Sequence, residues 1–297
     1  HVLFLFNLFF MLLLIPFGIE GTTGNRSWLD FPFLPFNIQP GEVCKIPFII
    51  ILAKTMQTNR RKLSQPKSIL TMGFHVSFIV LLIVMLSKDA GVALVYIFIF
   101  LIMAFVGGVS LWWFAAGIAA VAAAAPILWK FVMRNDQKER IAMIFDPSID
   151  PEGLDVRWHS NQSMKSLSNG GLTGQGLFQG ARTQSDALVH DHTDFIFAVV
   201  GEEFGFIGCI LVLLLLIALI VRCFYVAVKC NNALGYLVCS GIGAMFIAQV
   251  LENIGMCLAK LPVIGITLPF MSYGGSSMLA SFCLIGVIQS INAHRGK

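Results

Sequence analysis

Long apolar runs alternate with short polar segments along most of the chain. A run of about 18 to 20 apolar residues is long enough to cross the hydrocarbon core of a bilayer as a helix. The runs lie roughly at 1–19, 42–56, 69–87, 91–106, 109–131, 204–224, 234–258 and 274–293. The pattern predicts an all-α polytopic membrane protein with about eight transmembrane helices. We expect a single integral membrane domain over 1–297.

Composition agrees with a membrane protein. Hydrophobic residues make up 57% of the chain and charged residues 12%, which excludes an ordinary soluble fold. The net charge of +4 is too small and too scattered to indicate a nucleic-acid partner. The seven cysteines form no Cys-x-x-Cys pair, so we expect buried apolar thiols, not a disulfide framework. Because the chain opens on His1 inside an apolar run, we also expect upstream spans to be missing.

Basic residues orient the predicted spans. The short segment 57–68 carries Arg60, Arg61, Lys62 and Lys67, and such loops face the cytoplasm. Alternation from there puts 134–193 outside, as the large extracellular loop.

Acids and imidazoles gather where this loop re-enters the membrane. They are His190, Asp191, His192, Asp194, Glu202 and Glu203. Charged groups at such a boundary are costly unless they are paired or used. Asp194 is the candidate general base, and the alternative interpretation is an ordinary acid at the start of a helix. Ligands crowded into one short stretch do not converge easily, so we expect no metal.

Other charged positions suggest anion binding or structural pairing. Glu42 and Lys45 share a helix face at i, i+3 and are expected to pair, either for structure alone or also in contact with substrate. Arg26 and Arg140 could bind an anionic group in bidentate fashion, or could be solvated loop residues. Glu202 lies between two glycines whose spacing permits close helix contact, and is expected to shape a cavity.

A glycine-rich run over 170–180 superficially suggests a phosphate-binding loop. Its last interval is one residue too long for Gly-x-Gly-x-x-Gly, and no strand–helix unit surrounds it. Turns that let backbone segments approach closely are the better interpretation.

Five stretches of the chain resemble the SEDS family, the RodA, FtsW and SpoVE type proteins of bacterial cell-wall synthesis. They are Gly24-Asn25-Arg26-Ser27-Trp28; Gln39-Pro40-Gly41-Glu42 with Lys45; Gln137, Glu139 and Arg140 with Asp146-Pro147; His192-Thr193-Asp194-Phe195-Ile196-Phe197 with Gly201-Glu202-Glu203; and Pro262-Val263-Ile264-Gly265 continuing to Ser272-Tyr273-Gly274-Gly275-Ser276-Ser277. They occur in the family's order. Gly41 stands where the family has serine. Family members usually have ten spans, which agrees with two being absent.

The resemblance implies a peptidoglycan glycosyltransferase that polymerises lipid II at the outer face of the bacterial cytoplasmic membrane, for elongation, division or sporulation. It implies a class B penicillin-binding protein as partner and no cofactor. The essential aspartate of the family corresponds to Asp194. The expected substrate-binding residues are Arg26, Glu42, Lys45, Arg140, Glu202 and Ser272. Two alternatives from other classes remain, a lipid II flippase and a non-catalytic scaffold for the penicillin-binding protein.

Overall fold

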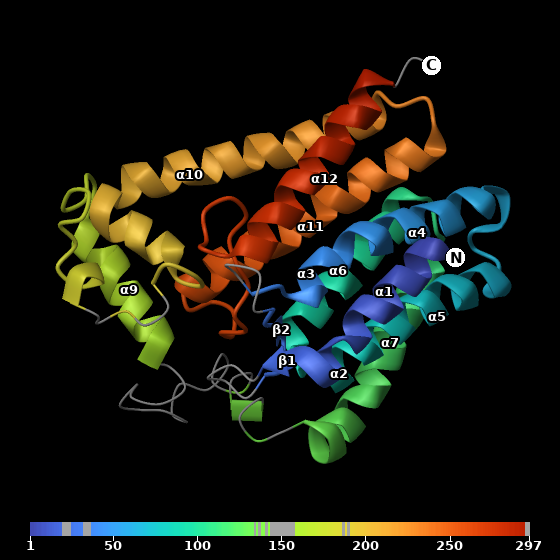
Figure 1. Ribbon diagram of the computed structural model, residues 1–297, viewed down its shortest axis with the longest axis horizontal. Helices are drawn as coiled ribbons and strands as arrows, with labels where there is room; N and C mark the ends of the chain where they lie inside the picture. The colour runs from blue at the N-terminus through green and yellow to red at the C-terminus, as the bar shows by residue number, and fades with distance from the viewer. Residues whose placement is uncertain are drawn as a thin grey trace. The chain divides into compact units, whose positions relative to one another are not determined.

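Among the described residues, the regular structure is helical apart from one short two-stranded ribbon. This computed structural model describes residues 1–19, 25–31, 37–133, 135, 138–139, 142, 158–185, 188 and 191–294 (Figure 1). Its α-helices are α1 (Val2–Leu12), α2 (Leu14–Phe17), α3 (Pro40–Val43), α4 (Lys45–Thr58), α5 (Pro66–Leu82), α6 (Ala90–Val106), α7 (Leu111–Ile127), α9 (Trp158–Gly170), α10 (Ile196–Val228), α11 (Ala233–Cys257) and α12 (Gly275–Ala293). The predicted all-α membrane fold is confirmed.

Two compact units make up the chain. The first contains residues 1–109, 217–249 and 273–297, and the second contains 110–216 and 250–272. The expectation of a single domain over 1–297 stays a prediction.

Helix–helix packing builds the first unit. Helix α1 packs on α4, and α5 packs on α6. A π-helical turn, Ile83–Ser87, extends α5 as far as Lys88, whose left-handed backbone ends the helix. A short antiparallel ribbon follows α2: β1 (Gly18–Ile19) pairs with β2 (Trp28–Leu29). This ribbon is a minor departure from the expected all-α pattern.

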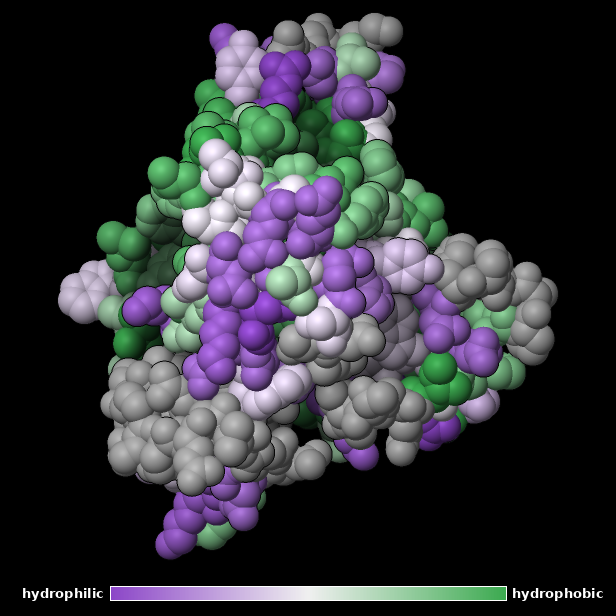
Figure 2. All heavy atoms as spheres, turned by 90° about the vertical axis from the view of Figure 1, so that its left-hand side faces the viewer, coloured by the Kyte–Doolittle hydropathy of each residue, from purple (hydrophilic) through white to green (hydrophobic). Residues whose placement is uncertain are grey.

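The second unit holds the part of the predicted extracellular loop that the structure describes. Residues 158–170 of that loop form α9, a helix that the apolar pattern did not predict. Figure 2 shows hydrophilic residues gathered on the face where α9 and the segment after it lie. Helix α9 turns a face of small residues inward: Ser160, Ser163, Ser166 and Gly170 are buried. These small side chains let the helix approach its neighbours closely.

Lipid-facing surfaces are recognisable by exposed apolar side chains. Over the described residues, five helical segments are long and apolar enough to cross a membrane: Pro66–Ser87, Leu111–Phe131, Ile196–Val228, Ala233–Cys257 and Gly275–Ala293. The apolar helices Val2–Phe17 and Ala90–Val106 are shorter. Trp112 on α7 is 83% exposed, whereas the charged Lys45 is fully buried. Such a distribution suits a protein whose solvent is lipid.

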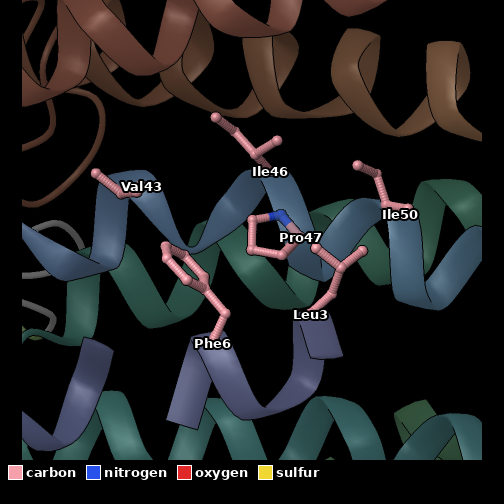
Figure 3. Close-up of a pocket in the computed structure, with 6 residues that line it drawn as sticks. All are labelled: Leu3, Phe6, Val43, Ile46, Pro47 and Ile50. Atoms are coloured by element: carbon pink, nitrogen blue, oxygen red, sulfur yellow. The ribbon is translucent and has the colours of Figure 1, made fainter. Parts of the chain in front are cut away.

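An apolar pocket of about 270 Å³ lies between α1 and the α3–α4 segment. Its lining is Leu3, Phe6, Val43, Ile46, Pro47 and Ile50 (Figure 3). None of these side chains carries a polar group, so this pocket has nothing with which to bind a sugar or a phosphate.

Candidate functional site

Asp194 lies in the turn that leads into α10. Residues 191–195 form this turn, and the helix begins at Ile196. The amides of Ala198 and Val199 donate to the Phe195 carbonyl, at 2.8 and 3.3 Å, so Asp194 precedes the first helical hydrogen bonds. Its side chain is only partly exposed. Asp194 therefore stands just outside the helix.

Buried side chains hold the backbone of this turn. The Ser272 hydroxyl donates to the Thr193 carbonyl at 2.6 Å and accepts from the Leu268 amide at 2.7 Å. The Nδ2 of Asn253, on α11, donates to the Asp194 carbonyl at 2.8 Å. The predicted substrate-binding residue Ser272 thus lies beside Asp194, with its hydroxyl engaged on backbone groups.

Glu202 binds the loop that follows α9. Its Oε1 accepts from the Arg182 amide at 2.9 Å, and its Oε2 accepts from the Thr183 amide at 3.0 Å. The side chain is fully buried. A carboxylate that accepts two backbone N–H groups has its charge satisfied by the protein itself. These contacts give Glu202 a role in holding the loop, and the expectation that it shapes a cavity stays a prediction.

A kink in α10 explains why the glycines of this region are needed. Gly205 has φ +66° and ψ −165°, which breaks the helix and leaves backbone groups without helical partners. Figure 1 shows the bend near the yellow start of α10.

The loop after α9 satisfies those backbone groups. The amides of Phe206 and Ile207 donate to the carbonyls of Gly171 and Leu172, at 2.9 and 3.2 Å. In return, the Glu202 and Glu203 carbonyls accept from the amides of residues 175 and 176, at 2.9 Å each. The glycine-rich run therefore hydrogen-bonds through its backbone to the backbone of α10 at the kink. This agrees with its interpretation as turns that let backbone segments approach closely.

Glu42 and Lys45 form the ion pair that their spacing predicts. The Lys45 Nζ lies 2.5 Å from Glu42 Oε1, and both side chains are buried. The pair belongs to the first unit, at the junction of α3 and α4. A Cβ at Gly41, beside the pair, would lie 2.8 Å from the Val92 side chain, so a larger residue there would require a local shift.

Asp89 is a third charged residue in this cluster, and sequence reasoning assigned it no role. Its Oδ1 caps α6 by accepting from the Val92 amide at 3.0 Å. Its Oδ2 accepts from Ser27 Oγ and Gln39 Nε2, at 3.4 and 3.3 Å. Asp89 lies between two apolar helices, outside both.

Burial is the main influence on the pKa of the Asp89 carboxyl group. It raises the pKa of Asp89 above its ordinary value, and the Glu42 carboxylate adds to the rise. The Val92 hydrogen bond, the Lys45 charge and the Ser27 hydrogen bond oppose it.

Arg26, one of the two predicted arginines, binds backbone carbonyls. The Arg26 guanidinium donates from Nε to the Gly18 carbonyl at 2.9 Å and from Nη2 to the Ile15 carbonyl at 3.1 Å. It therefore binds carbonyls at the end of α2, and its grip on a pyrophosphate stays a prediction. Arg140 lies outside the described residues.

Asp191 and His192 form a local pair on the Asp194 turn. The His192 Nδ1 lies 2.7 Å from Asp191 Oδ1. His190, the other imidazole of the cluster, lies outside the described residues. Within the described part of the chain, no group of three or more His, Cys, Asp or Glu is placed to hold a metal ion. The expected lack of a metal site stays a prediction.

The predicted site residues are divided between the two units. Arg26, Glu42 and Lys45 belong to the first unit, and Asp194, Glu202 and Ser272 to the second. Sequence reasoning missed Asn253. The available signal was an amide within an apolar run, since a buried amide in a membrane helix needs hydrogen-bond partners.

Comparisons with known proteins give one consistent result. The model of the FtsW, RodA and SpoVE family, described as cell cycle proteins, matches residues 1–297. The peptidoglycan glycosyltransferase MrdB of Escherichia coli K12 is 35% identical over 276 residues, covering 92% of this chain and 72% of the relative. Stage V sporulation protein E of Bacillus subtilis is 33% identical over 295 residues, covering 96% of this chain and 77% of that protein.

Solved structures agree. A chain of a peptidoglycan synthase complex, described for its coordination of polymerization and crosslinking, matches with a TM-score of 0.80 at 29% identity, over 99% of this chain and 80% of that one. The rod shape-determining protein RodA of Thermus thermophilus matches with a TM-score of 0.69 at 27% identity, over 99% and 78% of the two chains.

Proposed function

Because this chain belongs to the FtsW, RodA and SpoVE family, we propose that it is a peptidoglycan glycosyltransferase that polymerises lipid II at the outer face of the cytoplasmic membrane. The observation that carries the proposal is the family match over the whole chain. Relatives at 35% and 32% identity bear the name of that activity. The protein is a multi-pass membrane protein, as its apolar helices require.

Asp194 is the proposed general base. Joining two lipid-linked saccharides forms a bond between an acceptor hydroxyl oxygen and the anomeric carbon of the donor. The bond from that carbon to the diphosphate breaks, and the lipid diphosphate leaves with its electron pair. The acceptor proton passes to the Asp194 carboxylate. General-base assistance of this kind contributes about 10²- to 10⁴-fold in rate.

The position of Asp194 supports this role. It stands on a turn at the start of a long apolar helix, where a substrate with a lipid anchor and a sugar head must also lie. Its backbone is tied to buried side chains, which fixes a reacting group well. Arg26, Glu42, Lys45 and Arg140 are the residues proposed to bind the donor diphosphate and sugars. Glu202 and Ser272, whose side chains bind backbone groups, are proposed to support the site through the segments that they hold.

The proposed partner is a class B penicillin-binding protein, which would cross-link the strands that this chain makes. The similarity to a chain of a peptidoglycan synthase complex supports a partnership of this type.

Polymerisation of purified lipid II by the full-length protein with its partner tests the proposal. The Asp194→Asn variant removes the base with almost no change of shape, and we expect its rate to fall about 10²- to 10⁴-fold. Asp191→Asn, on the same turn, is the matched control and should retain far more activity. Equal activity of Asp194→Asn and wild type would remove Asp194 from the mechanism.

The same experiment separates the alternatives. A wild-type complex that assembles without making polymer would favour a scaffold. A wild type that moves lipid II across vesicles without polymerising it would favour a flippase.

A further inference from the structure

We propose that Asn253 is a positioning residue that, together with Ser272, fixes the direction in which the Asp194 carboxylate points. The inference rests on the proposed function, because it names what positions the proposed base.

The Asn253 amide joins three segments of the second unit. Its Nδ2 donates to the Asp194 carbonyl and to the Ile266 carbonyl, both at 2.8 Å. The residue is on α11 and is fully buried. An amide nitrogen has two N–H donors, so both are used. Replacing that nitrogen with an atom that cannot donate would remove this hydrogen bond from both carbonyls.

Ser272 holds the neighbouring peptide from another direction. Its hydroxyl bridges the Leu268 amide and the Thr193 carbonyl. The Ser272 amide in turn donates to the Leu268 carbonyl at 3.0 Å, which closes the turn that carries the serine. Two successive carbonyls of the 191–195 turn, those of residues 193 and 194, are therefore held by two separate segments.

Fixing two successive carbonyls fixes the peptide planes on both sides of Asp194. The backbone angles of that residue are then determined, and so is the direction of its Cα–Cβ bond. Only the two side-chain torsions remain adjustable. A reacting group displaced by about 1 Å can cost about 100-fold in rate. A change in the direction of the Asp194 Cα–Cβ bond would therefore lower the rate of catalysis.

The second hydrogen bond of Asn253 acts on the surroundings of the carboxylate. Ile266 directly follows Gly265, which has φ +71°. A Cβ at Gly265 would lie 3.3 Å from Asp194 Oδ2, so this glycine borders the carboxylate. By binding the Ile266 carbonyl, Asn253 sets both the backbone of the base and the loop that borders its carboxylate.

Steady-state polymerisation by the full-length complex, measured as kcat and KM for lipid II, tests this assignment. Asn253→Asp keeps the shape and removes both N–H donors, leaving at most the single O–H donor of a protonated carboxyl group. We expect kcat to fall about 100-fold with KM changed less than about threefold, because the variant alters the aim of a base and not a substrate contact. Ser272→Ala should act in the same direction, and Ser272→Thr, which retains the hydroxyl, should restore most of kcat.

Ser163→Ala is the matched control. Ser163 is also a buried hydroxyl bound to a backbone carbonyl of the same unit, that of Cys257, at 2.9 Å, and this hydrogen bond does not involve a residue of the turn. It should reduce thermal stability without a selective loss of kcat. If Ser163→Ala and Asn253→Asp lose kcat equally, or if the loss in Asn253→Asp is entirely in KM, positioning is excluded.

Hydrogen–deuterium exchange provides a readout that is independent of activity. Asn253→Asp and Ser272→Ala should speed exchange of the amides of Ala198 and Val199, which bond to the turn at Phe195. Unchanged exchange would contradict the proposal that Asn253 and Ser272 hold the turn. An inactive wild type would overturn the proposed function, while the exchange result would still decide whether Asn253 and Ser272 hold the turn.

Discussion

The ammonium of Lys45 and the carboxylate of Glu42 meet at 2.5 Å in the interior of the first unit. Neither side chain has meaningful access to solvent. Desolvating two charges is expensive, and their attraction offsets that cost only while both are present. The folded state therefore needs both members of the pair, whether or not the pair also touches substrate.

Lys45→Ala should reduce stability strongly, because it leaves the Glu42 carboxylate buried without its partner. Losing one member of a buried pair costs about 3–5 kcal/mol. Thermal unfolding of the purified protein in detergent measures the loss. Lys54→Ala, at an exposed position of the same helix, is the control and should change stability by less than about 0.5 kcal/mol.

A double variant distinguishes a structural from a substrate role for this pair. Glu42→Leu with Lys45→Met replaces the pair with apolar side chains and should recover much of the stability that Lys45→Ala loses. Polymer formation that recovers together with stability would contradict a substrate contact by Lys45. Stable protein without polymer would support that contact.

The raised pKa of Asp89 leads us to expect that the stability of the folded protein decreases as pH rises. Folding raises its pKa, so between the ordinary and the raised value the folded protein binds more protons than the unfolded protein. Stability must then fall as pH rises through that window. Asp89→Asn cannot titrate and should lack this component. We expect the melting temperature of wild type, relative to that of Asp89→Asn, to decrease as pH rises above the ordinary aspartate pKa of about 4. A difference that is constant or increases with pH would contradict the shift.

The features that the sequence revealed are those set by local spacing. The i, i+3 interval of Glu42 and Lys45 predicted their ion pair, and the apolar runs predicted the spanning helices. Asp194 could be placed near a membrane boundary because a long apolar run begins ten residues later.

Contacts between distant segments could not be predicted in this way. Asn253 is 59 positions from Asp194, and its role depends on how α11 packs on the turn before α10. Helix α9 was missed for another reason. Its buried face is made of serine and glycine, so it lacks the apolar period that marks a helix. Helix α9 packs so close to α10 that a Cβ on Gly170 would clash with the Gly201 backbone.

Labelling of single cysteines tests the predicted topology. Ser168 on α9 and Arg61 in the basic segment are both exposed. With an impermeant thiol reagent added to intact cells whose outer face is accessible, Ser168→Cys should react and Arg61→Cys should react only after permeabilisation. Both variants need a Cys283→Ser background, because the native Cys283 is exposed. The opposite labelling pattern would place the Asp194 turn on the cytoplasmic side and rule out polymerisation outside.

Glu202 and Glu203 are adjacent acids with unequal contacts, and this difference gives a sharp test. Glu202 accepts two backbone amides at 2.9 and 3.0 Å, whereas Glu203 is contacted by side chains at 3.4 and 3.5 Å. Glu202→Gln turns an amide donor toward a backbone donor, so it should cost about 1–3 kcal/mol and speed exchange of the amides of Arg182 and Thr183. Glu203→Gln, the matched control, should cost less than half as much. If Glu202→Gln instead raises KM for lipid II while these amides exchange as slowly as in wild type, then Glu202 binds substrate and does not serve mainly to hold the loop.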